Sequence, residues 1–301
     1  MKTLLNIFAL IAVVGSSFII WAILGTPKVN DITGCVVTHT YKIKLCAKNE
    51  NYVNLQKINT IFKNLVIISE DASFYSHRGF DFAELKNSFS SNMSTKRIAR
   101  GGSTITQQLA KNVFLPFDKT LTRKIREAIL ANNIEHILTK DQILEKYLNV
   151  IEFGPNIYGI TAAAKFYFSK RPADLNLLES AFLTYLIPNP KVYHRVYTNK
   201  KLTPYSRFRI LALCYRMYRF QKILLGQYYA AREYVDQFPW KDLTAWQNNN
   251  LNGILTITDP DYSDMPSQPS SDEPIPEFDS TVDYVEPSLD ELDIPDDAFD
   301  Y

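Results

Sequence analysis

The sequence is poor in the residues that most often bind metals. It holds four histidines and three cysteines in 301 residues, and the histidines, at positions 39, 77, 136 and 194, lack the spacing typical of metal ligands. No glycine-rich nucleotide fingerprint follows a predicted strand. Ser-x-x-Lys and Lys-Thr-Gly are also absent, which argues against serine acyl-enzyme chemistry. The sequence therefore predicts neither a metal site nor a nucleotide site.

Positive charge is missing from the carboxyl-terminal segment. Residues 259–301 contain 15 Asp or Glu and no Lys or Arg, so the first 258 residues carry 33 basic and 17 acidic residues, a net charge of +16. Such a basic body favours an anionic partner: nucleic acid, acidic phospholipid or a phosphorylated substrate. Residues 258–301 are dominated by Pro, Ser, Asp and Glu and cannot bury enough apolar surface to fold alone. They are predicted to form an acidic, Pro-rich disordered tail, either solvated or docked on a partner or on the basic body.

Charge is also missing near the amino terminus, where Leu4 to Leu24 contains no charged residue. As a helix this run would span roughly 30 Å, the thickness of a bilayer's hydrocarbon core. We therefore expect a transmembrane anchor at residues 1–26 and a juxtamembrane connector at 27–51. Lys2 favours a cytoplasmic amino end, with the body on the outer side. The alternative is a signal peptide cleaved near Gly15, although the apolar run continues well past that point.

The three cysteines fit an oxidising compartment without requiring one. Cys35 and Cys46 flank a stretch that alternates enough to form a short hairpin, and they could form a disulfide or remain two thiols. Cys214 lies in an apolar helical pattern and is predicted to be buried.

The sequence between the connector and the acidic tail is predicted to be mainly helical. Apolar residues recur every three or four positions from about Leu55 to Ile67, and a capping box at Thr139–Gln142 opens another helix. Further helices are expected over 121–138, from about 174 to 187, and over 205–229. Residues 88–102 are polar and lack periodicity, which predicts a mobile loop. The fold class is thus mainly α.

Two polar clusters could carry chemistry. Glu70 and Asp71 follow an apolar helix, where partial burial can raise the pKa of a carboxylate and make it a base near neutral pH. Taken alone, they could simply be exposed acids at a helix end. Gly101 to Asn112 combines glycines, hydroxyls, amides and Lys111, which can bind sugar hydroxyls or phosphate oxygens. Alone, it could be a glycine turn before an ordinary polar helix.

Two further clusters are less informative by themselves. Arg123 and Glu127 are four residues apart, so they share one face of a predicted helix and could be only a surface ion pair. Residues 140–149, followed by Phe153-Gly154 and Tyr158-Gly159-Ile160, look structural, with Leu and Tyr side chains forming a core stripe.

In their order and spacing, the clusters closely resemble the five motifs of the peptidoglycan glycosyltransferase family, family 51. These are Glu-Asp-x-x-Phe-x-x-His-x-Gly at 70–79, Gly-Gly-Ser-Thr-Ile-Thr-Gln-Gln at 101–108, Arg-Lys-x-x-Glu at 123–127, Ile-Leu-Glu-x-Tyr-Leu-Asn at 143–149, and Gly-Ile-x-x-Ala-Ala from 159. The resemblance spans roughly residues 52–220. It implies a lysozyme-like glycosyltransferase domain, which we place at 52–250, of the monofunctional biosynthetic transglycosylase type. About 80 residues follow the matched region, too few for a transpeptidase domain.

The resemblance also assigns roles. Glu70 matches the general base and Glu127 the second acidic residue of the catalytic pair. The positions that shape the site or contact the pyrophosphate and sugars are Asp71, His77, Ser103, Thr104, Gln107, Gln108, Lys111, Asn112, Arg123 and Lys124.

The implied reaction polymerises lipid II into β-1,4-linked glycan strands with inversion and releases undecaprenyl pyrophosphate. No cofactor is required, although a divalent cation (Mg or Mn) could assist at the pyrophosphate. The expected partners are lipid II, the growing lipid-linked chain, the membrane and, through the acidic tail, cell-wall synthesis proteins; nucleic acid is not expected. The expected location is the bacterial inner membrane, single-pass, with the catalytic domain on the periplasmic side. The alternatives are a lytic or hydrolytic muramidase, which needs no cationic site, and an inactive cell-wall scaffold.

Overall fold

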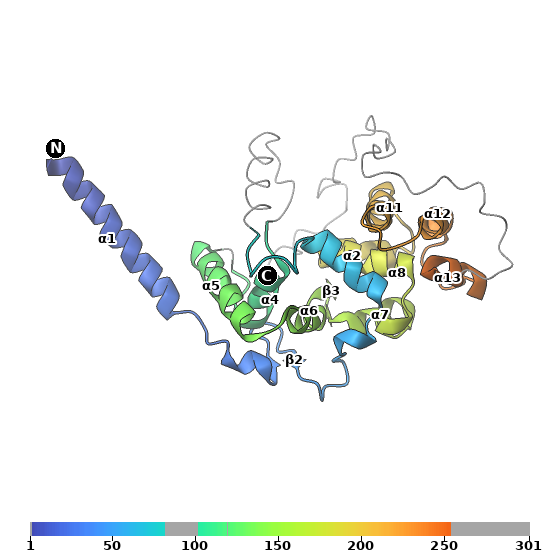
Figure 1. Ribbon diagram of the computed structural model, residues 1–301, viewed down its shortest axis with the longest axis horizontal. Helices are drawn as coiled ribbons and strands as arrows, with labels where there is room; N and C mark the ends of the chain where they lie inside the picture. The colour runs from blue at the N-terminus through green and yellow to red at the C-terminus, as the bar shows by residue number, and fades with distance from the viewer. Residues whose placement is uncertain (1, 82–101, 119, 254–301) are drawn as a thin grey trace. The chain divides into compact units, whose positions relative to one another are not determined.

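The computed structural model describes residues 2–81, 102–118 and 120–253 (Figure 1). The chain divides into two units, Met1–Asp174 and Leu175–Tyr301. Both are mainly helical, which confirms the predicted fold class. The predicted tail at 258–301 and nearly all of the predicted loop at 88–102 lie outside the described residues. Within the described ranges, no helix combines the length and apolar character needed to cross a membrane.

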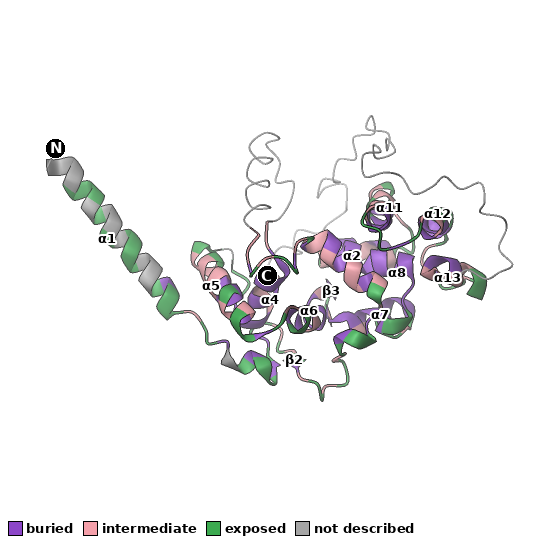
Figure 2. Ribbon diagram, in the orientation of Figure 1, coloured by how far each residue is buried: buried purple, intermediate pink, exposed green. Residues whose placement is uncertain are grey.

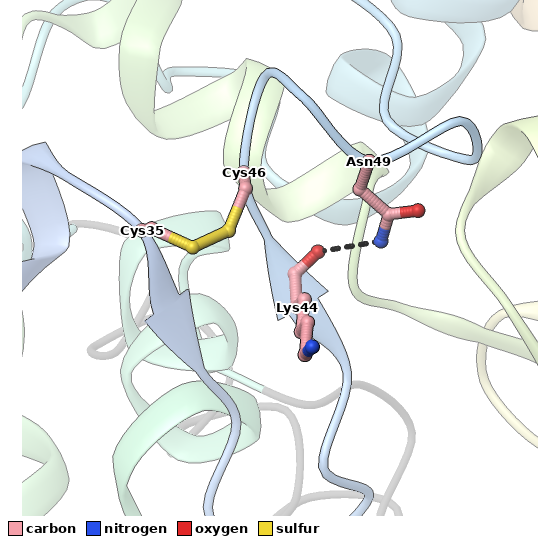
Figure 3. The surroundings of a disulfide bond; sticks show 4 residues. All are labelled: Cys35, Lys44, Cys46 and Asn49. Carbon is pink, nitrogen blue, oxygen red and sulfur yellow. Dashed lines mark hydrogen bonds between the residues drawn. A yellow bond between two sulfur atoms is a disulfide. The ribbon is translucent and has the colours of Figure 1, made fainter.

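The first unit begins with a helix and a small hairpin. Helix α1 (Lys2–Leu24) and the 3-10 helix η1 (Asn30–Thr33) precede strand β1 (Val36–Val37), which pairs antiparallel with β2 (Lys44–Leu45). Cys35 and Cys46, at the open end of this hairpin, form a disulfide with Cα atoms 4.6 Å apart (Figure 3). Of the two states that the sequence left open for Cys35 and Cys46, the structure shows the disulfide.

Four helices form the core of the first unit: α2 (Thr60–Glu70), α4 (Ile105–Phe114), α5 (Leu121–Ile137) and α6 (Lys140–Leu148). Helix α4 packs against both α5 and α6, with Leu109 and Ala110 of α4 completely buried. The apolar run that begins at Leu55 is not one helix. It starts as the 3-10 helix η2 (Leu55–Lys57), Ile58 is extended, and Asn59 then caps α2 by accepting a hydrogen bond from the Ile61 backbone.

A second hairpin, which we did not predict, completes this unit. Strand β3 (Glu152–Gly154) pairs with β4 (Ile157–Tyr158), and these strands are too short to show an alternating pattern. Gly159 leads from the hairpin into α7 (Ile160–Phe168) with φ +79°, a left-handed conformation suited to glycine. The 3-10 helix η3 (Pro172–Asp174) ends the unit.

The second unit is built around α8 (Leu177–Leu186), all ten residues of which are buried (Figure 2). Helices α11, α12 and α13 pack against it. Cys214 is completely buried, as predicted. The predicted helix over 205–229 is two helices, because Gln221 adopts φ +54° between them. The elements that follow α8 are α9 (Pro190–Tyr193), α10 (Arg195–Thr198), α11 (Pro204–Arg219), α12 (Leu225–Tyr234), η4 (Val235–Gln237) and α13 (Ala245–Asn252).

Candidate active site

The Glu70 carboxylate lies at the end of α2 and is held by a side-chain relay. Gln108 Nε2, on α4, donates to Glu70 Oε2 at 3.0 Å, and the hydroxyl of Tyr147, on α6, donates to Gln108 Oε1 at 2.9 Å. Burial, together with the charges of Glu70 and Asp71, raises the pKa of the Tyr147 hydroxyl well above 10.0. Tyr147 therefore remains a neutral donor, and Gln108 has its amide NH2 directed at the carboxylate.

Asp71 is buried, and its carboxylate connects the end of α2 to the start of α4 and to His77. Its Oδ2 accepts a hydrogen bond from the backbone nitrogen of Ile105 at 3.0 Å, which fixes the start of α4 next to the end of α2. Its Oδ1 lies 2.8 Å from His77 Nε2, while His77 Nδ1 is buried with no hydrogen-bond partner among the described residues. An acid beside the first amides of a helix is also favoured by the helix dipole. Asp71 thus joins the two helices that carry Glu70 and Gln108.

A capping box fixes the first turn of α4. Thr104 Oγ1 accepts from the Gln107 backbone, Gln107 Oε1 accepts from the Thr104 backbone at 3.0 Å, and Thr104 Oγ1 donates to the Gly79 carbonyl at 2.8 Å. Both side chains are about 4% exposed and are engaged in these contacts. Ser103, just before the cap, accepts a 2.9 Å hydrogen bond from Lys124 Nζ. The glycine-rich motif therefore sets the position of α4 and connects it to α5.

Helix α5 presents the third motif. Thr120 caps this helix by accepting from the Arg123 backbone, so the motif occupies its first two turns. Arg123 Nη1 lies 2.8 Å from Glu127 Oε2, and Lys124 Nζ contacts Glu127 Oε1. The Glu127 side chain is only 3% exposed, whereas Lys124 is 46% exposed. Each oxygen of a buried carboxylate is thus paired with a cation that reaches toward solvent.

Lys111 connects these groups electrostatically. Burial lowers the pKa of its amine, the charges of Glu127 and Glu70 oppose that shift, and those of Arg123 and Lys124 add to it. Both carboxylates and both neighbouring cations therefore lie within electrostatic range of one amine. We call Glu70, Lys111, Arg123, Lys124 and Glu127 the carboxylate–cation cluster. Asn112 follows Lys111 on α4 and is half-buried.

The structure places all the residues of the predicted site in one unit, and all except Asn112 belong to the cluster or make one of the hydrogen bonds or ion pairs described above. Their catalytic and binding roles remain predictions. Tyr147 is completely buried, which confirms its place in the predicted core stripe. Its hydroxyl also reaches Glu70 through Gln108, a contact that we did not predict, although Tyr147 belongs to the fourth motif. Among the described residues, no group of three His, Cys, Asp or Glu side chains is arranged to hold a metal ion.

A family model and several curated proteins that match this chain all carry the name transglycosylase. A family model described as "Transglycosylase" matches residues 37–218. The "Biosynthetic peptidoglycan transglycosylase" of Nitrosomonas eutropha is 43% identical over 142 residues, which cover 47% of this chain and 58% of that protein. The protein of the same name from Bordetella avium is 41% identical over 170 residues, covering 55% and 70% of the two chains. That from Nitrosomonas europaea is 44% identical over 156 residues, covering 52% and 64%.

Proposed function

The chain belongs to the transglycosylase family, and from this membership and the carboxylate–cation cluster we propose that it is an inverting glycosyltransferase that polymerises lipid II into β-1,4-linked peptidoglycan strands. The chain spans 58% and 65% of the lengths of two curated relatives that it matches, from Nitrosomonas eutropha and Methylobacillus flagellatus. The observation that carries the proposal is the pairing of buried Glu127 with Arg123 and Lys124 at the start of α5, with the charges of Glu70 and Glu127 both acting on the amine of Lys111.

In the proposed reaction, the 4-hydroxyl of a lipid II acceptor attacks the anomeric carbon of the lipid-linked donor. Glu70 takes the hydroxyl proton as the new C–O bond forms and the bond to the diphosphate breaks. The Tyr147–Gln108 relay holds one oxygen of Glu70, which fixes the carboxylate for proton transfer. Direct displacement inverts the anomeric centre, so an α-linked donor yields a β linkage.

The cations of the cluster match the leaving group. A departing diphosphate concentrates negative charge, and preorganised cations stabilise such charge most where water is partly excluded. Lys111, Arg123 and Lys124 supply three positive charges, and Glu127 fixes two of them through its ion pairs. Because Glu127 is already paired in this way, we propose that the transfer uses no resident metal ion. A divalent cation that assisted would arrive with the diphosphate.

We further propose that the lysozyme-like domain works at the outer face of the bacterial inner membrane, as a monofunctional enzyme held by a single amino-terminal anchor. The uncharged run from Leu4 to Leu24 supports the anchor, and Lys2 supports its orientation. Substrates with polyprenyl tails require an enzyme held at the bilayer. The acidic tail would then be available to bind other cell-wall synthesis proteins.

The test is to incubate the purified full chain with lipid II and, separately, with preformed glycan strands. We expect polymer from lipid II and no cleavage of the strands. Glu70→Gln should lower the polymerisation rate by at least about a hundredfold, whereas Glu233→Gln, at an exposed glutamate of α12, should not change it. Strand cleavage without polymer would establish the hydrolase alternative. A wild-type chain inert toward both substrates would favour the scaffold, and an active Glu70→Gln would remove Glu70 from its role.

A further inference from the structure

A cavity of about 560 Å³ lies in the first unit between the disulfide hairpin and α6. Cys35, Cys46 and Lys48 line it on the hairpin side, and Glu145 and Lys146 line it on α6. It shares no residue with the carboxylate–cation cluster. Its volume lies within the range of small-ligand sites, roughly 300–1,000 Å³.

The hairpin wall of this cavity is fixed in place. The disulfide joins the two strands next to the cavity, and Asn49 Nδ2 donates to the Lys44 carbonyl at 2.9 Å just beyond it (Figure 3). The α6 wall is fixed by the capping box of Thr139 and Gln142. Both walls are thus held independently of any ligand, as expected of a preformed binding site.

The α6 wall carries Lys146, whose amine contacts no counter-ion among the residues that the structure describes. Lys146 is 8% exposed, and its amine makes no hydrogen bond or ion pair with any residue that the structure describes. Burial lowers the pKa of this amine, and the charge of Glu145 opposes the shift. Most of the side chain is therefore covered, while its Nζ is not among the buried nitrogens and stays open to solvent. An ammonium at the end of such a covered stem is held in place and can still contact a ligand. An anion in the cavity would supply the missing partner.

The neighbouring Glu145 is already engaged. Its Oε1 accepts a 2.6 Å hydrogen bond from the Tyr52 hydroxyl, and its Oε2 accepts a 2.8 Å hydrogen bond from the Leu55 backbone. Lys48, exposed on the hairpin, is the second cation of the lining. Two lysines against one glutamate give the lining a net charge of +1. The charge balance therefore favours an anionic ligand.

We infer that this cavity binds a phosphate group, with Lys146 as its main contact and Lys48 at the rim. An ammonium is a compact point charge that suits phosphate, and the volume leaves room for a substituent on the phosphate. The source is either free phosphate or the headgroup of an anionic phospholipid. The lipid source rests on the proposed anchor, because the lining begins at Thr33, nine residues after α1 ends at Leu24. The phosphate site itself does not depend on the anchor.

The experiment uses the full chain and two probes. In detergent, inorganic phosphate is titrated at constant ionic strength while binding is followed by calorimetry. In vesicles, the thermal unfolding midpoint is compared between phosphatidylcholine alone and an equal mixture with phosphatidylglycerol. Binding of phosphate in detergent without an effect of phosphatidylglycerol would identify the free ion as the ligand. Stabilisation by phosphatidylglycerol, with or without phosphate binding, would identify the headgroup.

Three variants locate the effect. Lys146→Met removes the charge but keeps much of the stem, and it should weaken the response by about tenfold or more. Lys48→Met, at an exposed position that folding tolerates, should weaken it severalfold. Lys165→Met makes the same charge change on the exposed face of α7 and should leave the response unchanged.

A wild-type chain that responds to neither probe would overturn the inference, as would equal weakening by all three variants, which would indicate only general attraction to a basic body. If Lys146→Met does not fold, the responses of Lys48→Met and Lys165→Met to the two probes are compared instead. A weaker response in Lys48→Met alone supports the site, and equal responses contradict it. Neither probe is lipid II, so failure here leaves the proposed function untouched, and failure to polymerise leaves this site untouched.

Discussion

Gln108 stands between Tyr147 and Glu70, accepting a 2.9 Å hydrogen bond from the Tyr147 hydroxyl and donating one of 3.0 Å to Glu70 Oε2. An amide can donate through nitrogen and accept through oxygen. The tyrosine therefore determines which end of the amide faces the carboxylate. The catalytic role proposed for Glu70 depends on a hydroxyl that belongs to another helix.

Tyr147→Phe should therefore slow polymerisation while leaving the fold intact. Loss of one hydrogen bond of about 0.5–1.5 kcal/mol corresponds to a decrease of roughly two- to tenfold in kcat. We expect KM for lipid II to change less, because the hydroxyl positions the base rather than the substrate. The matched control is Tyr75→Phe, which removes an exposed hydroxyl bonded to Asp141 at 2.9 Å. Equal rates for wild type and Tyr147→Phe would remove the relay from the mechanism.

Local sequence signals predicted the elements that carry the site. The capping box at Thr139 and Gln142 and the helix over 121–138 both depend on contacts within a few residues, and the structure contains both. The relay could not be predicted in this way, because Gln108 is 38 residues from Glu70 and 39 from Tyr147. Only the resemblance to a family suggested that these positions meet.

Where sequence reasoning failed, the cause was a short element or a single backbone angle. The break between α11 and α12 follows from the left-handed conformation of Gln221, a residue type with no strong preference for it. The hairpin at 152–158 has strands too short for a period to appear. The state of Cys35 and Cys46 was left open rather than mispredicted, because it depends on a spatial distance that their spacing in sequence does not fix.

Gly159→Ala should destabilise the first unit. Gly159 has φ +79°, and an added Cβ would lie 2.7 Å from the carbonyl oxygen of Asn149. The alanine would be strained at this positive φ, and its Cβ would clash with the backbone. The substitution should therefore lower the free energy of unfolding by about 1–3 kcal/mol. Denaturant unfolding measures this change.

Gly226→Ala is the matched control for that change. Gly226 lies within α12, and an added Cβ meets nothing within 4 Å. Alanine is the better helix former, so this variant should be more stable by about 0.5–1 kcal/mol. Similar effects of the two substitutions would contradict the conformation described at Gly159.

Thiol chemistry should distinguish the three cysteines. Burial raises the pKa of the Cys214 thiol to about 12, so almost no thiolate is present near neutral pH. We expect a thiol reagent to label no cysteine in the native chain, one after denaturation, and three after denaturation with reduction. Mass spectrometry counts the labels and locates them. Three labels after denaturation without reduction would show that Cys35 and Cys46 are not joined.

The pH profile of polymerisation should depend on Lys111. Burial lowers the pKa of its amine below the ordinary 10.5, so the positive charge is lost at a lower pH than for an exposed lysine. If that charge stabilises the leaving diphosphate, kcat/KM, which reports groups of the free enzyme, declines as pH rises through the lowered pKa. Lys111→Arg keeps its charge throughout this range, so its alkaline decline should move upward by more than about one pH unit. Lys165→Arg, at an exposed lysine outside the site, should keep the wild-type profile. An alkaline decline at the same pH in Lys111→Arg would show that another group titrates, and the stabilisation of the leaving group would then have to be assigned to Arg123 and Lys124.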